Sequence, residues 1–113
     1  MNYTILIVDD DMAWNDMLVK KKKKNGYITY SAYSGTEALL FLEKQKVNLI
    51  ILDLMLPGLS GEQVLAEIKK TKNESCSWIY IYQDEDSRWI TTLPDHFWFP
   101  IVIWALKKSG PAN

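Results

Sequence analysis

Three aspartates in this sequence each come at the end of an apolar run, where their carboxylates could share a cation. Asp9 and Asp10 follow the run at residues 4–8, and Asp53 follows the run at residues 47–52. If the two runs are neighbouring strands, the three carboxylates meet and repel one another unless a cation lies among them. Oxygen ligands without imidazole or thiolate suit Mg²⁺, whose open coordination positions take phosphate oxygens. The pattern predicts a magnesium site that accepts or binds a phosphoryl group.

A simpler interpretation is that these acids only end strands at the solvated surface. For Asp11 alone we favour such a local role, as the cap of the helix that follows it. For Asp9, Asp10 and Asp53 taken together we favour the shared cation site, because three acids at strand ends require compensation if the strands are adjacent.

The segments that must position these acids alternate between strand and helix patterns. Three short runs predict strands, at residues 4–8, 27–32 and 47–52. Helical apolar spacing follows each run, at Trp14, Met17 and Leu18, then Ala38, Leu39, Phe41 and Leu42, then Val64, Leu65 and Ile68. The first and third strands are apolar on both faces, so helices should cover both sides of the sheet. This order predicts an α/β fold with a parallel sheet and right-handed crossovers.

The helices have recognisable start and stop signals. The first should end at Asn25-Gly26, and Ser34-Gly35-Thr36 should begin the second. Pro57-Gly58 breaks the chain before a third helix at about residues 61–71. The carboxyl ends of the first and third strands, with their acids, then lie where parallel α/β sheets bind ligands.

Composition excludes several classes of protein. The chain has 113 residues, 48% hydrophobic and 24% charged, which is typical of one soluble globular domain. Thirteen basic and fourteen acidic residues give a net charge of −1, so we expect no direct nucleic-acid binding. Cys76 is the single cysteine, which excludes an internal disulfide, and no Cys/His cluster suggests zinc. The apolar stretches are too short to span a membrane, and no signal peptide is recognised, so we expect a cytoplasmic location.

The segments around the acids resemble a known family. Ile5-Leu6-Ile7-Val8-Asp9-Asp10-Asp11 and Leu49-Ile50-Ile51-Leu52-Asp53-Leu54-Met55-Leu56-Pro57-Gly58-Leu59-Ser60-Gly61 look like the acidic motifs of bacterial two-component response regulator receiver domains. Their separation is typical of that family, and the intervening Ser34-Gly35-Thr36-Glu37-Ala38-Leu39 fits its second helix. The resemblance covers residues 3–73 and implies a flavodoxin-like doubly wound parallel sheet with strand order 2-1-3-4-5. It also implies a single receiver-like domain over residues 1–113.

The resemblance assigns roles to individual residues. Asp53 becomes the phosphoacceptor, Asp9 and Asp10 hold Mg²⁺ with it, and Met55 supplies a backbone carbonyl to the ion. Pro57-Gly58 shapes the loop after the acceptor. A sensor histidine kinase is the implied phosphoryl donor, and a receiver homodimer is a second implied partner. The chain would not be an enzyme, beyond catalysing phosphorylation and dephosphorylation of its own aspartate.

Residues 74–113 depart from the family pattern. A receiver's fourth strand normally ends in Ser or Thr and its fifth in Lys-Pro. Here the fourth segment ends near Tyr82 and Gln83, no Lys-Pro follows, and the spacing of Lys107-Lys108 is a poor match. The switch hydroxyl and lysine are therefore not found. This Trp-rich segment is either a rebuilt last third, with its strand–helix units degraded, or the product of a shifted reading frame. No output domain is recognised, so the chain is expected to be truncated.

Other reactive residues have ordinary interpretations. Lys20–Lys24 should be a solvated helix end, although Lys21 or Lys22 falls where the apolar stripe should continue and should cost stability. His96 stands alone as an ordinary surface or half-buried residue, and Cys76 is a small residue at a strand start.

Three functions follow from these observations. The leading one is a signalling switch phosphorylated on Asp53. The second is a non-phosphorylatable or damaged receiver-like module that acts, if at all, by protein contact. The third is a flavodoxin-like electron carrier, which we disfavour because Ser34-Gly35-Thr36 follows the second strand, whereas flavin phosphate loops follow the first.

Overall fold

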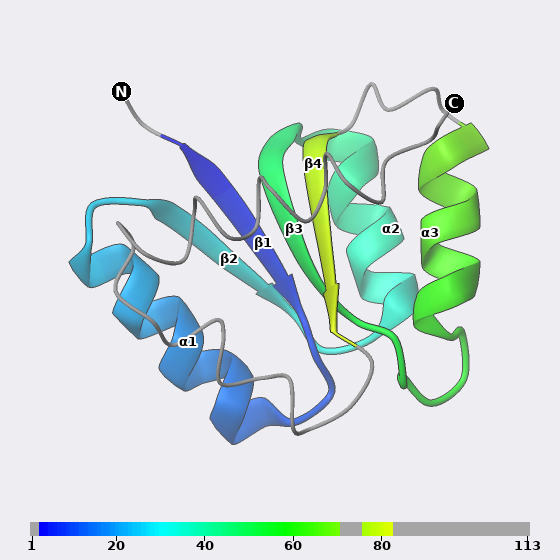
Figure 1. The fold of residues 1–113 in the computed structure, drawn as a ribbon, viewed down its shortest axis with the longest axis horizontal. Helices are drawn as coiled ribbons and strands as arrows, with labels where there is room; N and C mark the ends of the chain where they lie inside the picture. The colour runs from blue at the N-terminus through cyan, green and yellow to red at the C-terminus, as the bar shows by residue number, and fades with distance from the viewer. Residues whose placement is uncertain (1–2, 71–75, 83–113) are drawn as a thin grey trace.

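The computed structural model describes residues 3–70 and 76–82, which form a parallel sheet with helices on both faces (Figure 1). The elements in chain order are β1 (Thr4–Val8), α1 (Met12–Lys24), β2 (Ile28–Ala32), α2 (Gly35–Lys44), β3 (Val47–Asp53), α3 (Gly61–Lys70) and β4 (Cys76–Tyr82). The strand order is β2-β1-β3-β4, and every pair is parallel. The predicted doubly wound α/β fold is confirmed over these four strands, and a fifth strand would lie outside the described residues.

The helices cover the sheet as the two-sided apolar strands require. α1 lies on one face, while α2 and α3 lie side by side on the other (Figure 1). Alternate strand residues point to opposite faces, so Ile7 and Ile51 pack with Leu18 of α1, whereas Leu6 and Ile50 pack toward α2 and α3. All five side chains are 0% exposed. Burial of each contributes about 1.5–3 kcal/mol, so the central strands β1 and β3 anchor the fold.

The helix ends follow the predicted signals. The side chain of Asp11 accepts the Trp14 backbone N–H at 3.1 Å, which confirms it as the cap of α1. Ser34 caps α2 by accepting the Glu37 N–H at 3.1 Å. α1 ends at Asn25, and Gly26 follows with φ +96°, a left-handed conformation that suits glycine. These caps set where the chain leaves each strand and where each helix begins.

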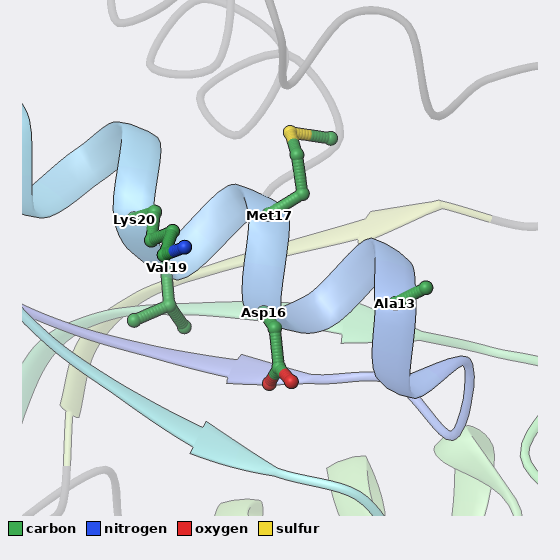
Figure 2. A pocket seen from close by; sticks show the side chains of 5 residues that line it. All are labelled: Ala13, Asp16, Met17, Val19 and Lys20. Carbon is green, nitrogen blue, oxygen red and sulfur yellow. The ribbon is translucent and has the colours of Figure 1, made fainter.

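The face of α1 that packs on the sheet differs from the predicted apolar stripe. Its buried residues are Asn15, Leu18 and Lys22, which repeat with helical spacing. Met17, which the pattern placed on the stripe, is 39% exposed. Figure 2 shows it on a surface hollow lined by Ala13, Asp16, Met17, Val19 and Lys20. α1 therefore packs through a face that is partly polar.

The lysine run is not uniformly solvated. Lys23 and Lys24 are exposed as predicted, but Lys22 is 0% exposed, so the expectation of a solvated helix end is wrong at this position. The helical period explains the difference, since Lys22 lies four residues after the buried Leu18. The accompanying expectation, that Lys21 or Lys22 would fall on the inner face, is confirmed for Lys22.

Candidate functional site

Three aspartates meet at the carboxyl ends of β1 and β3, as the sequence pattern predicted. Asp9 directly follows β1, and Asp53 is the last residue of β3. One carboxylate oxygen from each of Asp9, Asp10 and Asp53 lies within 4.8 Å of the others. Asp9 is 0% exposed and Asp53 is 6% exposed, whereas Asp10 is exposed. Two carboxylates of the acidic cluster are therefore buried, and the third, that of Asp10, is accessible to solvent.

Strand alternation explains why the two buried acids share one side of the sheet. Ile7 and Ile51 belong to the core cluster on the α1 face, and each aspartate comes two residues later, Asp53 as the last residue of β3 and Asp9 directly after β1. β1 and β3 are adjacent and in register through Val8 and Leu52, so these side chains are brought to the same edge. The acids are therefore placed by the parallel pairing itself.

The turn between β1 and α1 holds Asp9. Its Oδ1 accepts the backbone N–H of Asp11 at 2.9 Å, and its own N–H donates to the Ala32 carbonyl at 3.1 Å. Asp11 in turn caps α1, so the residue that begins the helix also orients the buried carboxylate. This arrangement fixes Asp9 with respect to both β2 and α1.

The buried side-chain amide of Asn15, which the sequence pattern did not predict, forms hydrogen bonds to several groups beside the cluster. The Asn15 side-chain nitrogen lies 3.0 Å from the carbonyls of Asp9 and Ala32, and 3.2 Å from that of Ile7. Its Oδ1 accepts the Ser31 hydroxyl at 2.7 Å. Only its position one helical turn before Leu18 could have marked it as an inward-facing residue. Asn15 satisfies buried carbonyls at the ends of two strands, and so supports the backbone beside the acidic cluster.

The loop after β3 orients Asp53. The backbone N–H of Met55 donates to Asp53 Oδ1 at 2.9 Å, while the Met55 side chain is 69% exposed. Gly58 has φ +69°, so the predicted loop residue Pro57 is followed by a left-handed turn that favours glycine. At Gly61, where α3 begins, a Cβ would lie 2.5 Å from the Asp53 carbonyl oxygen. The loop therefore folds back closely onto the phosphoacceptor candidate.

Tyr82 is the residue of β4 that reaches the cluster. It pairs in register with Asp53, is 2% exposed, and donates a hydrogen bond from its hydroxyl to Oδ2 of Asp9. By sequence, Tyr82 or Gln83 lies nearest to the expected Ser or Thr, and no local pattern predicts the contact with Asp9. Cys76 is the first residue of β4, as predicted. Gln83, His96 and Lys107-Lys108 lie outside the described residues.

The donor set of the cluster fits a small divalent cation. Three carboxylates supply hard oxygen ligands, which Mg²⁺ prefers, and the exposed Asp10 leaves room for the waters that the ion retains. Without a cation, three negative charges at this separation repel one another. The assignment of individual ligands, including the Met55 carbonyl, stays a prediction.

Comparison with known families agrees with this geometry. A family model described as the response regulator receiver domain matches residues 5–93. The chain belongs to the receiver-domain family. Receiver domains are signalling modules of two-component systems, in which phosphorelay and magnesium binding are typical. The match runs through β4, so the receiver resemblance extends beyond residue 73, where the motifs alone had ended it.

A curated relative of this receiver is a longer protein. The receiver is 35% identical over 71 residues to the regulatory protein VanRc of Enterococcus gallinarum. This match covers 63% of the receiver but only 31% of VanRc. The chain thus spans less than a third of the length of that relative.

Solved structures share the fold. The receiver domain of a Francisella response regulator superposes with a TM-score of 0.69 at 20% identity, covering 96% of this chain and 100% of that one. The Thermotoga maritima response regulator TrrA, solved in complex with Mg²⁺ and BeF, has a TM-score of 0.61 at 25% identity, covering 75% and 90% of the two chains. The first likeness supports the flavodoxin-like receiver fold alone.

Proposed function

We propose that this receiver accepts a phosphoryl group on Asp53 from a sensor histidine kinase, in a magnesium-dependent reaction. The observation that carries the proposal is the convergence of Asp9, Asp10 and Asp53 at the carboxyl edge of a receiver sheet. The response regulator TrrA was solved in complex with Mg²⁺ and BeF, which supports the binding of a cation and a phosphoryl-like group by this chain. We also propose that residues 1–113 form one receiver domain.

The proposed step transfers a phosphoryl group between two side chains. An oxygen of the Asp53 carboxylate attacks phosphorus, a P–O bond forms, and the P–N bond to the kinase histidine breaks. The electron pair leaves with the imidazole, which takes up a proton, and the product is an acyl phosphate. Mg²⁺ held by Asp9, Asp10, Asp53 and the Met55 carbonyl would supply charge compensation and alignment for the transferred group.

The residues of the chain contribute orientation and shielding. The Met55 N–H holds one oxygen of Asp53, which limits rotation of the attacking carboxylate. Asp53 is 6% exposed, so bulk water has little access to its carboxyl carbon. Pro57 and Gly58 shape the loop that carries this N–H. The chain would accept the phosphoryl group, and it would catalyse only the phosphorylation and dephosphorylation of its own Asp53.

A small phosphodonor with Mg²⁺ tests this proposal. Incubation with acetyl phosphate should add one phosphoryl group by intact-mass analysis, and removal of Mg²⁺ by a chelator should abolish the gain. Asp53→Asn should not be modified, whereas Asp16→Asn, which alters an exposed aspartate of α1, should be modified like the unchanged chain. Phosphorylation that persists in Asp53→Asn, or that is equal with and without Mg²⁺, would contradict Asp53 as the magnesium-dependent phosphoacceptor.

A second candidate function is a receiver-like module that works by protein contact without phosphorylation. The buried Tyr82 at the end of β4, where the family pattern has Ser or Thr, favours it. Absence of modification by acetyl phosphate, together with binding of the unmodified chain to a histidine kinase, would select this alternative.

We propose a sensor histidine kinase as donor and a receiver homodimer as a further assembly, with no direct binding to nucleic acid. Among the helices that the structure describes, none has the length and apolar character needed to cross a membrane. The cytoplasmic location stays a prediction.

A further inference from the structure

The last described residue of β4 sends its side chain into the acidic cluster. Tyr82 comes two residues after Tyr80 on the α1 face of the sheet, and its ring is buried in the same core cluster as Ile7 and Ile51. Its backbone carbonyl accepts the Leu54 N–H at 3.0 Å. Tyr82 therefore has a fixed backbone beside β3 and a polar tip that reaches Asp9.

The two oxygens of Asp9 are engaged in different ways. Oδ1 accepts the Asp11 backbone N–H at 2.9 Å, a bond that belongs to the turn into α1. Oδ2 accepts the Tyr82 hydroxyl, whose hydrogen can rotate away about the C–O bond. A cation bound at Oδ2 would lie beside this hydroxyl proton, and the two positive centres would repel each other.

We propose that the Tyr82 hydroxyl competes with the divalent cation for Oδ2 of Asp9 and thereby lowers the affinity of the acidic cluster for Mg²⁺. The inference rests on the proposed cation site and adds a residue that tunes it. Without a cation, the hydroxyl partly offsets the repulsion among Asp9, Asp10 and Asp53. A cation at Oδ2 would weaken this hydrogen bond, and an interaction that is stronger in the cation-free state reduces the affinity for the cation.

Removal of the hydroxyl tests the competition. Tyr82→Phe keeps the aromatic ring in the core and deletes the donor. We expect MgCl₂ to bind the variant about ten-fold more tightly than the unchanged full-length chain in calorimetric titrations without phosphodonor, because hydrogen bonds to charged groups have about this strength. Saturating Mg²⁺ should also raise the melting temperature of Tyr82→Phe by more than it raises that of the unchanged chain. Equal or weaker Mg²⁺ binding by the variant would overturn the inference.

Tyr80→Phe is the matched control. It removes a hydroxyl from the same strand and the same face, but its register partner is Ile51 rather than Asp53. We expect its Mg²⁺ affinity to equal that of the unchanged chain, and an equal gain in both variants would overturn the specific role of Tyr82. If neither the unchanged chain nor Tyr82→Phe binds Mg²⁺, the cation site of the proposed function fails as well.

A measurement on the unaltered chain keeps the inference testable if Tyr82→Phe does not fold. The chain has six tyrosines, and ¹³C labelling of their ring Cζ atoms reports the hydrogen bonding of each phenol. We expect one resonance to shift in proportion to Mg²⁺ occupancy as the hydrogen bond to Asp9 weakens. Six resonances that stay unchanged at saturating Mg²⁺ would show that the hydroxyl keeps its bond, and would refute the competition.

Discussion

At the scale of single residues, the site depends on polar side chains that are buried and fully engaged. Asp9 has hydrogen bonds to the turn at Asp11 and to Tyr82, and Asn15 donates to the backbone carbonyls beside the cluster and accepts from Ser31. A buried polar group is costly when it loses its partners, so these contacts make the carboxyl edge of the sheet sensitive to small changes. The same sensitivity makes the arrangement testable by single substitutions.

Asn15→Ala should destabilise the fold strongly. The substitution removes a two-hydrogen donor shared by the Ile7, Asp9 and Ala32 carbonyls, of which Ala32 keeps the Asp9 N–H, so we expect the free energy of unfolding to fall by about 2–3 kcal/mol. Urea denaturation of both proteins measures the change. Ser31→Ala, which deletes a single partner of Asn15, should cost only about 1 kcal/mol. A loss in Asn15→Ala no larger than in Ser31→Ala would mean that the carbonyls do not depend on this amide.

Asp10→Asn should raise the melting temperature of the Mg²⁺-free protein. It removes one negative charge from the cluster, and because Asp10 is exposed we expect a gain of about 1 kcal/mol or less. Thermal unfolding in a chelator, at low ionic strength, measures it. Saturating Mg²⁺ should remove or reverse this advantage, since the variant lacks a ligand. An unchanged or lower melting temperature in the chelator would argue that the carboxylates do not interact.

At the scale of elements, the loops and helix starts determine where the acids lie. β3 could be predicted from its apolar run, but the path of the loop back onto Asp53 depends on Gly58 and on the close approach at Gly61. α1 was predicted from spacing and its cap, yet its inner face contains Asn15 and Lys22. Spacing identifies a helix more reliably than the exact face it buries, because one position changes the direction of a side chain by 100°.

Gly61→Ala should damage the junction between β3 and α3. A Cβ at this position would lie 2.5 Å from the Asp53 carbonyl oxygen and 2.5 Å from Leu54 Cα, and backbone atoms do not yield easily. We expect a loss of about 2–3 kcal/mol in urea denaturation and weaker Mg²⁺ binding.

Gly26→Ala is the comparison for the junction variant. Nothing lies within 4 Å of a Cβ there, although φ is +96°, so we expect a cost of only about 1 kcal/mol and unchanged Mg²⁺ binding. Similar Mg²⁺ affinity in Gly61→Ala and Gly26→Ala would show that the close approach does not support the site.

The contact between α1 and the segment after β2 predicts a pH effect. The Tyr33 hydroxyl donates to Asp16, and this hydrogen bond is the main reason that the pKa of Tyr33 is raised above its usual value. Because the pKa is higher in the folded state, the hydrogen bond stabilises the fold fully below the usual tyrosine pKa of about 10. This stabilisation is lost as the pH rises through the folded-state pKa.

Phenolate absorbance during an alkaline titration checks this effect. In Asp16→Asn, which keeps a hydrogen-bond acceptor but removes the charge, one tyrosine should titrate at lower pH than in the unchanged chain. Burial also raises the pKa of Tyr80, so Tyr33→Phe identifies which titration belongs to Tyr33. Identical titrations of Asp16→Asn and the unchanged chain would contradict the assigned contact.

At the scale of the whole molecule, the fold and the acidic cluster were predictable, whereas the inner shell of the site was not. Residues 4–8 and 47–52 are apolar on both faces, which requires a covered parallel sheet, and parallel strands bring Asp9 and Asp53 to one edge. The contact of Tyr82 with Asp9 joins residues 73 positions apart and depends on the register of β4, which no local pattern encodes. Contacts between side chains far apart in the sequence therefore cannot be predicted from local patterns alone.

The register of β4 also leads to a prediction about signalling. A ligand shifts a two-state equilibrium only through contacts that differ between the two states. The residue at the end of β4 is a tyrosine whose ring is buried in the core and whose carbonyl accepts the Leu54 N–H, so its hydroxyl is poorly placed to follow a phosphoryl group. We expect Asp53 to accept the group slowly, with little conformational response.

Hydrogen exchange with a phosphoryl mimic measures that response. We expect beryllofluoride with Mg²⁺ to leave amide exchange nearly unchanged in residues 76–82 and through 113, compared with Mg²⁺ alone. Tyr82→Thr returns a small hydroxyl of the family type, and should show more protection than the unchanged chain if the tyrosine is what limits the switch. Strong new protection in the unchanged chain, absent in Asp53→Ala, would show that a working switch exists with tyrosine at this position.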